Sequence, residues 1–378
     1  MNYFDKHFNL LVLIVVSLAS AVFLFWEWQT AVLAIEATST IENNVVFNIE
    51  PSRAKPPAQT VKAVYLTAYS AGSAKKLDEI IGLIDKTELN AVVIDIKDYS
   101  GLVLYDSQVP LVKKLKLKSN RLGDVVAMIK KLHANSIYVI ARQTVFQDPL
   151  LAEKKIEWAI KSKSGEVWRD NKNLAWVDPT QQGVWGYNLA IAKEAIRLGF
   201  DEINFDYVRF PSDGNMSQVV YTTGDKPKYE VMGEFYRFLS DGLKDEPAWI
   251  SLDMFGFVME KKGTDDMRIG QRLADAVSST DYVCPMMYPS HYPAGHLGFA
   301  NPAEHPGVVI ANGMEKGLHY FLNTRAKPRP WLQAFNMGAI YDAAKIRAQI
   351  DAAENNGADG WLLWNASNRY TAAGLNPD

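Results

Sequence analysis

Two aspartates close apolar segments in the middle of the chain and are the strongest candidates for chemistry. Asp206 ends the segment 202–206, and Asp253 lies near the end of the following apolar segment, 248–254. Cleavage of a glycosidic bond requires two carboxyl groups, one acting as the acid and the other as the nucleophile or base. We therefore predict Asp206 as the nucleophile or base and Asp253 as the general acid.

The segment around Asp206 has the alternation of a half-polar strand. Ile203, Phe205 and Tyr207 fall on one face, whereas Glu202, Asn204 and Asp206 fall on the other. In a parallel barrel the apolar face meets the helices, and the chemistry lies at the C-terminal ends of the strands. A structural alternative is that Asp206 pairs with Arg209 or caps the turn at Pro211.

Polar and aromatic side chains reach the same end when the alternation is applied to the other predicted strands. The predicted substrate-binding residues are Tyr69, Asp95, Lys97, Asp98, Arg142, Asn204, Arg209, Tyr288, Trp331, Gln333 and Trp364. Aromatic faces stack on sugar rings, and carboxylates and amides bind hydroxyl groups, so the mixture favours a carbohydrate ligand. Asp95 and Asp98 are also the reserve carboxylates. Alternatively, Trp331 and Trp364 fill the barrel, and Lys97 pairs with Asp95 inside it.

Short apolar segments alternate with amphipathic helical segments from residue 61 onward. The predicted strands are 62–68, 91–96, 136–141, 202–206, 248–254, 281–287, 330–335 and 360–364. The predicted helices include 74–87, 122–134, 182–198, 229–243 and 342–355. Eight such units indicate parallel pairing in an α/β fold, a (β/α)8 TIM barrel over residues 61–378. A doubly wound open sheet is disfavoured because no Gly-x-Gly-x-x-Gly turn follows the first strand.

Local signals set element ends and loops within this pattern. Asp178 is the predicted cap of helix 182–198, Pro179 fits its first turn, and Gly199 ends it. Three long loops, 97–118, 143–180 and 288–328, are expected on the catalytic face. The second of these is predicted to form a hairpin with exposed aromatic side chains.

Composition excludes several classes of protein. Lys and Arg total 40 against 43 Asp and Glu, a net charge of −3, which does not suggest a nucleic-acid partner. The single cysteine, Cys284, rules out an internal disulfide framework. Six histidines show no metal-ligand spacing, so neither a metal nor a cofactor is predicted.

The N-terminal segment predicts export. Residues 8–26 form an uncharged apolar run after Lys6 and His7, long enough to cross a hydrocarbon core of about 30 Å. Residues 1–30 are therefore a signal anchor or a signal peptide, and 31–60 a linker ending in a proline-rich stretch. We expect a single-pass membrane protein with an extracytoplasmic barrel, or a secreted barrel if the segment is cleaved.

Four ordered motifs carry a resemblance to a known family. They are Trp176-Val-Asp-Pro179, Gly199-Phe-Asp-Glu-Ile-Asn-Phe-Asp-Tyr-Val-Arg-Phe-Pro211, Asp281-Tyr-Val-Cys-Pro-Met-Met-Tyr-Pro289 and Gly357-Ala-Asp-Gly-Trp-Leu-Leu-Trp364. Over about residues 61 to 370 the chain resembles the bacterial family of glycoside hydrolase-like TIM barrels catalogued as a domain of unknown function. The resemblance implies a barrel that acts on polysaccharide.

Two more distant resemblances concern the residue that would act as the general acid. In the family-18 chitinases the fourth strand carries Asp-Gly-x-Asp-x-Asp-x-Glu, and here Asp201, Asn204 and Asp206 stand at the three aspartate places. Met286 and Tyr288 match the Met-x-Tyr of the sixth strand. The glutamate place is Val208, so the chitinase acid is missing. A strand-four aspartate followed by a strand-five acid is similar to the amylase-like layout, with Asp253 where that family has glutamate.

The sequence thus leads to one principal hypothesis and two rivals. The principal hypothesis is a glycoside hydrolase acting on an extracellular or cell-envelope polysaccharide. One rival is a TIM barrel that binds carbohydrate without cleaving it, since a fold does not establish an activity. The other is a metal-dependent polysaccharide deacetylase, which the scattered histidines disfavour.

Overall fold

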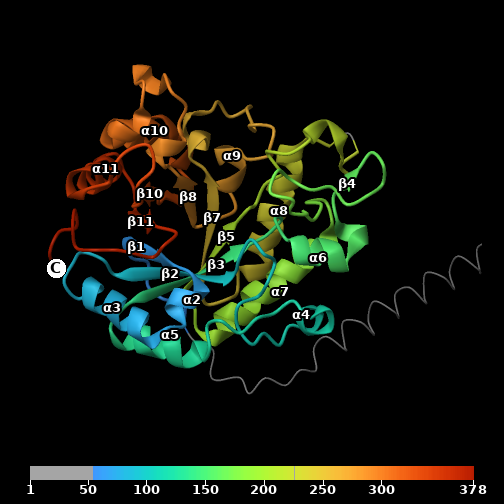
Figure 1. The fold of residues 1–378 in the computed structure, drawn as a ribbon, viewed down its shortest axis with the longest axis horizontal. Coiled ribbons are helices and arrows are strands. Elements are labelled where there is room, and N and C mark those ends of the chain that lie inside the picture. The colour runs from blue at the N-terminus through green and yellow to red at the C-terminus, as the bar shows by residue number, and fades with distance from the viewer. Residues whose placement is uncertain (1–53, 225) are drawn as a thin grey trace, which may run out of the picture. The chain divides into compact units, whose positions relative to one another are not determined.

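A closed barrel of eight parallel strands forms the centre of the computed structural model, which describes residues 54–224 and 226–378 (Figure 1). The barrel strands are β1 (Val61–Leu66), β2 (Ala91–Lys97), β3 (Tyr138–Thr144), β5 (Glu202–Asp206), β7 (Trp249–Phe255), β8 (Tyr282–Met286), β10 (Trp331–Gln333) and β11 (Gly360–Trp364). The barrel closes because β10 pairs with both β8 and β11, and β11 pairs with β1. The short β9 (Lys327–Pro328) extends the ladder along β8. The predicted (β/α)8 barrel is confirmed.

Helices surround the strands (Figure 1). They are α2 (Ala68–Ala71), α3 (Ala74–Ile84), α4 (Pro110–Leu115), α5 (Val125–Ala134), α6 (Pro149–Lys154), α7 (Gln182–Leu198), α8 (Lys228–Leu243), α9 (Leu273–Ala276), α10 (Pro306–Gly317) and α11 (Ala343–Asn355). In α3 the Ser73 side chain caps the first turn, and one apolar stripe, including Ile80 and Ile84, is buried.

Helix α7 has the predicted bounds but a different N-cap residue, and Pro179 lies before its first turn. Gly199 ends it in the left-handed conformation at φ 113°, as predicted. The cap prediction was wrong, because Gln181 is the N-cap residue. The Asp178 carboxylate instead accepts hydrogen bonds from the backbone N–H groups of Thr180, at 3.0 Å, and Thr222, at 3.1 Å. It thereby joins the loops that follow β3 and β5.

Two apolar clusters lie on either side of the barrel wall. The larger fills the space between strands and helices and includes Ile203 and Phe205 of β5. The smaller lies inside the barrel and includes Tyr65, Ile140 and Trp331. This is the division that the alternation of β5 predicts, with apolar side chains outward and polar side chains inward.

The interior also holds a buried ion pair near the N-terminal ends of the strands. Arg329, between β9 and β10, donates from Nη1 to both carboxylate oxygens of Glu202, at 2.9 and 3.0 Å. Both side chains are fully buried. The hydroxyl of Tyr138 also donates to Glu202, at 3.2 Å, and the Tyr282 ring lies 3.5 Å from the guanidinium carbon.

The long loop after β3 folds into a small antiparallel layer. β4 (Lys161–Ser162) in this loop pairs with β6 (Val219–Val220) in the loop after β5. The expectation of exposed aromatic side chains was wrong, because Trp168 and Trp176 are buried beneath these loops. Their indole N–H groups donate to the Asn215 carbonyl, at 3.1 Å, and to Asp170, at 3.0 Å.

The predicted signal or anchor segment, residues 1–30, lies outside the described residues, as does the linker up to residue 53. Residues 54–60 form neither helix nor strand, and Trp249 of β7 donates to the carbonyl of Pro56 at 3.0 Å. Within the described part of the chain, none of the helices combines the length and the apolar character needed to cross a membrane.

Candidate active site

Asp206 and Asp253 lie side by side at the C-terminal ends of neighbouring strands. The ladder between β5 and β7 ends with the pair Phe205 and Leu252, so the next residues in register are the two aspartates. Neighbouring strands are about 4.8 Å apart, which brings the two carboxyl groups into one site. Asp206 is 3% exposed and Asp253 is 1% exposed. The predicted pair is therefore assembled by the backbone itself.

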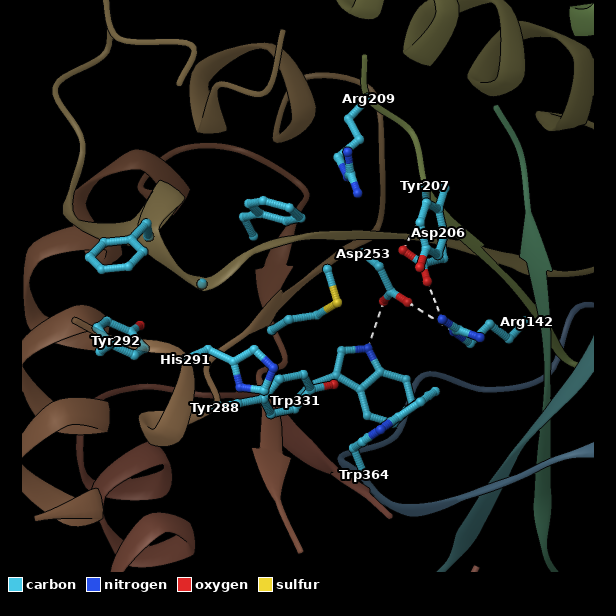
Figure 2. Close-up of a pocket in the computed structure, with 14 residues that line it drawn as sticks. Arg142, Asp206, Tyr207, Arg209, Asp253, Tyr288, His291, Tyr292, Trp331 and Trp364 are labelled. Carbon is cyan, nitrogen blue, oxygen red and sulfur yellow. Dashed lines mark hydrogen bonds and ion pairs between the residues drawn. The ribbon is translucent and has the colours of Figure 1, made fainter. Parts of the chain in front are cut away.

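Arg142 of β3 connects three carboxylates. Its Nη1 donates to Asp95 at 2.8 Å. Its Nε lies 3.3 Å from Oδ2 of Asp253, and its Nη2 binds Asp206 (Figure 2). Burial lowers the pKa of this guanidinium, but the three carboxylates outweigh that effect and raise it well above the usual value. The partner of Asp206 is thus Arg142. The alternative pairing of Asp206 with Arg209 is not formed.

Asp253 has the environment of a carboxylic acid. Burial is the largest cause that raises its pKa, the nearby Asp206 carboxylate adds to it, and together they bring it to about 7. The counteracting contacts are Arg142 and two donors to Oδ1, which are Asn204 at 2.8 Å and the Trp331 indole at 2.7 Å. Oδ1 accepts two hydrogen bonds, whereas Oδ2 accepts only the longer one from Nε of Arg142, at 3.3 Å, so Oδ2 is the oxygen with room for a proton.

The reserve carboxylates occupy different surroundings. Asp95 accepts hydrogen bonds from the Tyr65 hydroxyl and from Arg142, and burial raises its pKa. Asp98 accepts from the backbone N–H and the hydroxyl of Ser100 and so stabilises a turn. Neither side chain lines the cavity that opens beside Asp206 and Asp253.

A cavity of about 480 Å³ opens beside Asp206 and Asp253, within the range of small-ligand sites. Its lining consists of Arg142, Asp206, Tyr207, Arg209, Asp253, Phe255, Gly256, Phe257, Met286, Tyr288, His291, Tyr292, Trp331 and Trp364. Figure 2 shows Tyr288, Trp331 and Trp364 on the side of Asp253 away from Arg209, whereas Tyr207 lies beside Asp206. Trp364 stacks on Tyr65 with ring centroids 3.8 Å apart. The cavity therefore combines two carboxyl groups, two guanidinium groups and aromatic walls.

Seven of the predicted site residues line this cavity, and the others do not. Asn204 contacts it through Asp253, as described above. Gln333 accepts from the Ser290 backbone N–H at 3.1 Å and supports the loop that carries His291. Tyr69 is 63% exposed on α2, where the Arg121 guanidinium lies over its ring. It does not reach the cavity.

Lys97 points away from the barrel interior. Its ammonium group lies 2.8 Å from Asp148 and donates to the Thr144 carbonyl at 2.6 Å. The alternation that predicted an interior position fails because the register with β3 shifts between Asp95 and Lys97. The alternative pairing of Lys97 with Asp95 is also not formed.

Five aromatic residues of the cavity were not predicted from the sequence: Tyr207, Phe255, Phe257, His291 and Tyr292. Tyr207 was assigned to the face that meets the helices, but its φ of 53° ends the alternation directly after Asp206. Its side chain therefore reaches the cavity. The other four could have been predicted from their positions in the sequence. Phe255 and Phe257 follow the predicted fifth strand, and His291 and Tyr292 lie near the start of a long loop.

A parallel barrel with paired carboxyl groups and an aromatic-walled cavity at the C-terminal ends of its strands defines a class, the glycoside hydrolase-like TIM barrels. The chain belongs to the family described as "Putative glycosyl hydrolase domain", whose model matches residues 63–370. The resemblance drawn from the four motifs is confirmed.

Several solved structures are similar to this chain, and the first two share its barrel. The glycoside hydrolase domain of PgaB (BpsB) from Bordetella bronchiseptica has 14% identity and a TM-score of 0.58, covering 82% of this chain and 95% of that one. The α-galactosidase TtGalA from Thermus thermophilus has 10% identity and a TM-score of 0.51, covering 84% and 60%. A hypothetical protein from Ruminiclostridium thermocellum has 40% identity over 50% of this chain and 96% of that one, with a TM-score of 0.47. A search of curated proteins finds no match.

Proposed function

We propose that the protein is a glycoside hydrolase that cleaves O-glycosidic bonds of an extracellular or cell-envelope polysaccharide. The observation that carries the proposal is the pair of neighbouring carboxyl groups with different surroundings. Asp206 is bound directly by the guanidinium of Arg142, whereas the pKa of Asp253 is raised to about 7 by burial and by Asp206. Asp253 is thus suited to carry a proton near neutral pH, and Asp206 is the neighbouring carboxyl group that can act as the nucleophile.

In the proposed reaction Asp253 transfers its proton to the glycosidic oxygen as the bond to the anomeric carbon breaks. Asp206 attacks that carbon and forms a glycosyl ester, which water then hydrolyses while Asp253 takes a proton from the water. Retaining enzymes hold the two groups about 5 to 5.5 Å apart, and the position of the aspartates on neighbouring strands favours this arrangement over the wider inverting one. NMR of the first product would show the retained anomer.

The proposal is tested by incubating the purified protein with a panel of envelope polysaccharides. We expect new reducing ends with the parental protein and about 100-fold or more slower release with Asp253→Asn. If glycan binds with the same affinity to both proteins and no product forms with either, the protein is a carbohydrate-binding barrel without catalysis. Mass spectrometry of the products identifies the linkage that is cut.

We also propose that the barrel lies outside the cytoplasmic membrane. The uncharged segment 8–26 and the stretch up to the barrel support this location. Protease added to intact spheroplasts should remove a tethered barrel, and a cleaved, secreted barrel should appear in the medium. Protection of the barrel in intact spheroplasts, with digestion only after lysis, would contradict both forms of the proposal.

A further inference from the structure

Arg209 is a buried cation that faces the cavity. It follows β5 by three residues, is 8% exposed, and lines the cavity together with Asp206 and Asp253. Figure 2 shows its guanidinium pointing from the surrounding loop toward the two aspartates. Its position differs from that of Arg142, which lies among carboxylates inside the barrel.

The hydrogen bonds of Arg209 leave one side of its guanidinium without a protein acceptor. Nη1 donates to the Phe210 carbonyl at 3.0 Å and lies 3.4 Å from the Ser212 hydroxyl. Within residues 54–224 and 226–378, no carboxylate oxygen lies within 4.0 Å of this group, and neither Nε nor Nη2 donates to a protein acceptor. A guanidinium carries five N–H donors, so three of them are available to a ligand.

Aromatic rings hold this guanidinium in place. Its central carbon lies 4.7 Å from the ring centroid of Phe255, 5.0 Å from Trp176 and 5.2 Å from Tyr207. Such contacts partly offset the cost of burying a cation, but burial still lowers the pKa of Arg209. A charge held at this cost, on a side chain that lines the cavity and has three donors that no protein group accepts, is arranged to bind an anion.

We propose that Arg209 binds the carboxylate of an acidic sugar unit next to the bond that is cleaved. The planar guanidinium matches a carboxylate through two parallel N–H···O bonds. A phosphate group fits less well because it carries close to two negative charges, and the cavity already contains Asp206 and Asp253. The inference rests on the proposed glycoside hydrolase function and names the substrate class, a polysaccharide containing uronic acid or another carboxylated sugar.

A competing role for Arg209 is purely electrostatic. Asp206 is among the carboxylates that act on Arg209 through space, so the cation could serve mainly to stabilise that carboxylate. In that case the preference for acidic ligands would survive in full in Arg209→Lys, which keeps the positive charge but loses the planar pair of donors. A carboxylate-binding site instead predicts a loss confined to ligands that carry the charge.

The test measures binding separately from catalysis. Asp253→Asn provides a background in which the ligand is not consumed, and calorimetry compares three oligosaccharides, of glucuronate, galacturonate and mannuronate, each with its carboxyl-reduced counterpart. We expect at least one acidic ligand to bind tenfold or more tightly than its reduced form. Adding Arg209→Gln should abolish that preference and change the affinity for the reduced form less than threefold, and Arg209→Lys should recover only part of it.

The matched control is Arg169→Gln, because Arg169 pairs with Glu153 on the exposed part of a neighbouring loop and does not line the cavity. It should leave the preference unchanged. If no acidic ligand binds better than its reduced form, or if Arg209→Gln weakens both forms equally, the inference is wrong. Preferential binding without cleavage by the parental protein would contradict the proposed hydrolase function alone. Cleavage of neutral glycans only would contradict the carboxylate site alone.

Discussion

Trp331 donates its indole N–H to Oδ1 of Asp253 at 2.7 Å, from a strand two positions away in the barrel. This bond favours the ionised carboxyl group and so opposes the burial that raises its pKa. Trp331 has no exposed surface, and its indole places an N–H group beside the acid. The strength of the proposed acid is therefore set partly by an aromatic residue of the cavity wall.

Replacing that donor should shift the pH dependence of cleavage. In Trp331→Phe the pKa of Asp253 should rise further, and because an acid is active only while protonated, the alkaline limb of kcat should move to higher pH. The measurement is a pH profile on the polysaccharide that the protein degrades. Trp361→Phe is the control, since that indole bonds to Glu354 outside the cavity. An unchanged limb in Trp331→Phe would contradict the role assigned to this bond.

The two aspartates should be needed for turnover. Asp206→Asn and Asp253→Asn are each expected to lower kcat by about 100-fold or more, because each removes a proton donor or a nucleophile. The comparison variant is Asp245→Asn, an exposed aspartate in the turn after α8. Parental activity in Asp253→Asn would contradict the acid role assigned to this residue.

Asp253→Asn should also change how stability depends on pH. A carboxyl group whose pKa is raised from 3.8 to about 7 on folding binds its proton more tightly in the native state. Its contribution is therefore favourable below about pH 4, and it is lost as the pH rises toward 7. The asparagine variant lacks this loss, so its Tm at pH 8 should equal or exceed the parental value, and the difference should shrink at pH 5. Thermal unfolding at the two pH values checks the sign.

Removing Arg142 should leave three carboxylates close together without their cation. We expect Arg142→Gln to lower the free energy of unfolding by about 3 to 5 kcal/mol near pH 8. The loss should be smaller at pH 5, because the uncompensated carboxyl groups take up protons there. Arg329→Gln is the comparison, a buried arginine of the same barrel with one carboxylate partner. Equal destabilisation by Arg142→Gln at both pH values would show that packing, and not charge, is what was lost.

His291 should not produce the alkaline limb. Burial lowers the pKa of this imidazole from 6.5, so the ring is predominantly neutral at pH 7. We expect His291→Asn to weaken substrate binding, seen as a higher KM, while the alkaline limb of kcat stays within about 0.5 pH unit of the parental position. A limb that disappears in this variant would identify His291 as the titrating group.

The barrel and the carboxyl pair could be predicted from local sequence patterns. In a strand the side chains alternate between two faces, so the strand's own residues indicate which side chains face inward. Two predicted strands, 202–206 and 360–364, match β5 and β11 without adjustment. The pairing of Asp206 with Asp253 needed only the order of the strands. These features depend on residues that are close together in the chain.

The failures share a different cause. Lys97 points outward because the register of β2 against β3 shifts, and Tyr207 reaches the cavity because its φ is positive. Both depend on how neighbouring strands and loops meet, which no single segment encodes. Arg142 was predicted as a ligand for substrate, but its three carboxylate partners come from three other strands, which lie near β3 only in the assembled sheet.

The ion pair between Glu202 and Arg329 has a consequence for how the barrel closes. A shift of β5 by one residue would turn Glu202 toward the helices and place Ile203 opposite Arg329, so two unpaired charges would be buried. A barrel that closes with β5 in the wrong register is thus destabilised far more than one in which two apolar strands shift by a residue. Asp206 lies four residues beyond Glu202 on the same strand. The register that this ion pair fixes near the N-terminal ends of the strands therefore determines which residue of β5 faces Asp253 at their C-terminal ends.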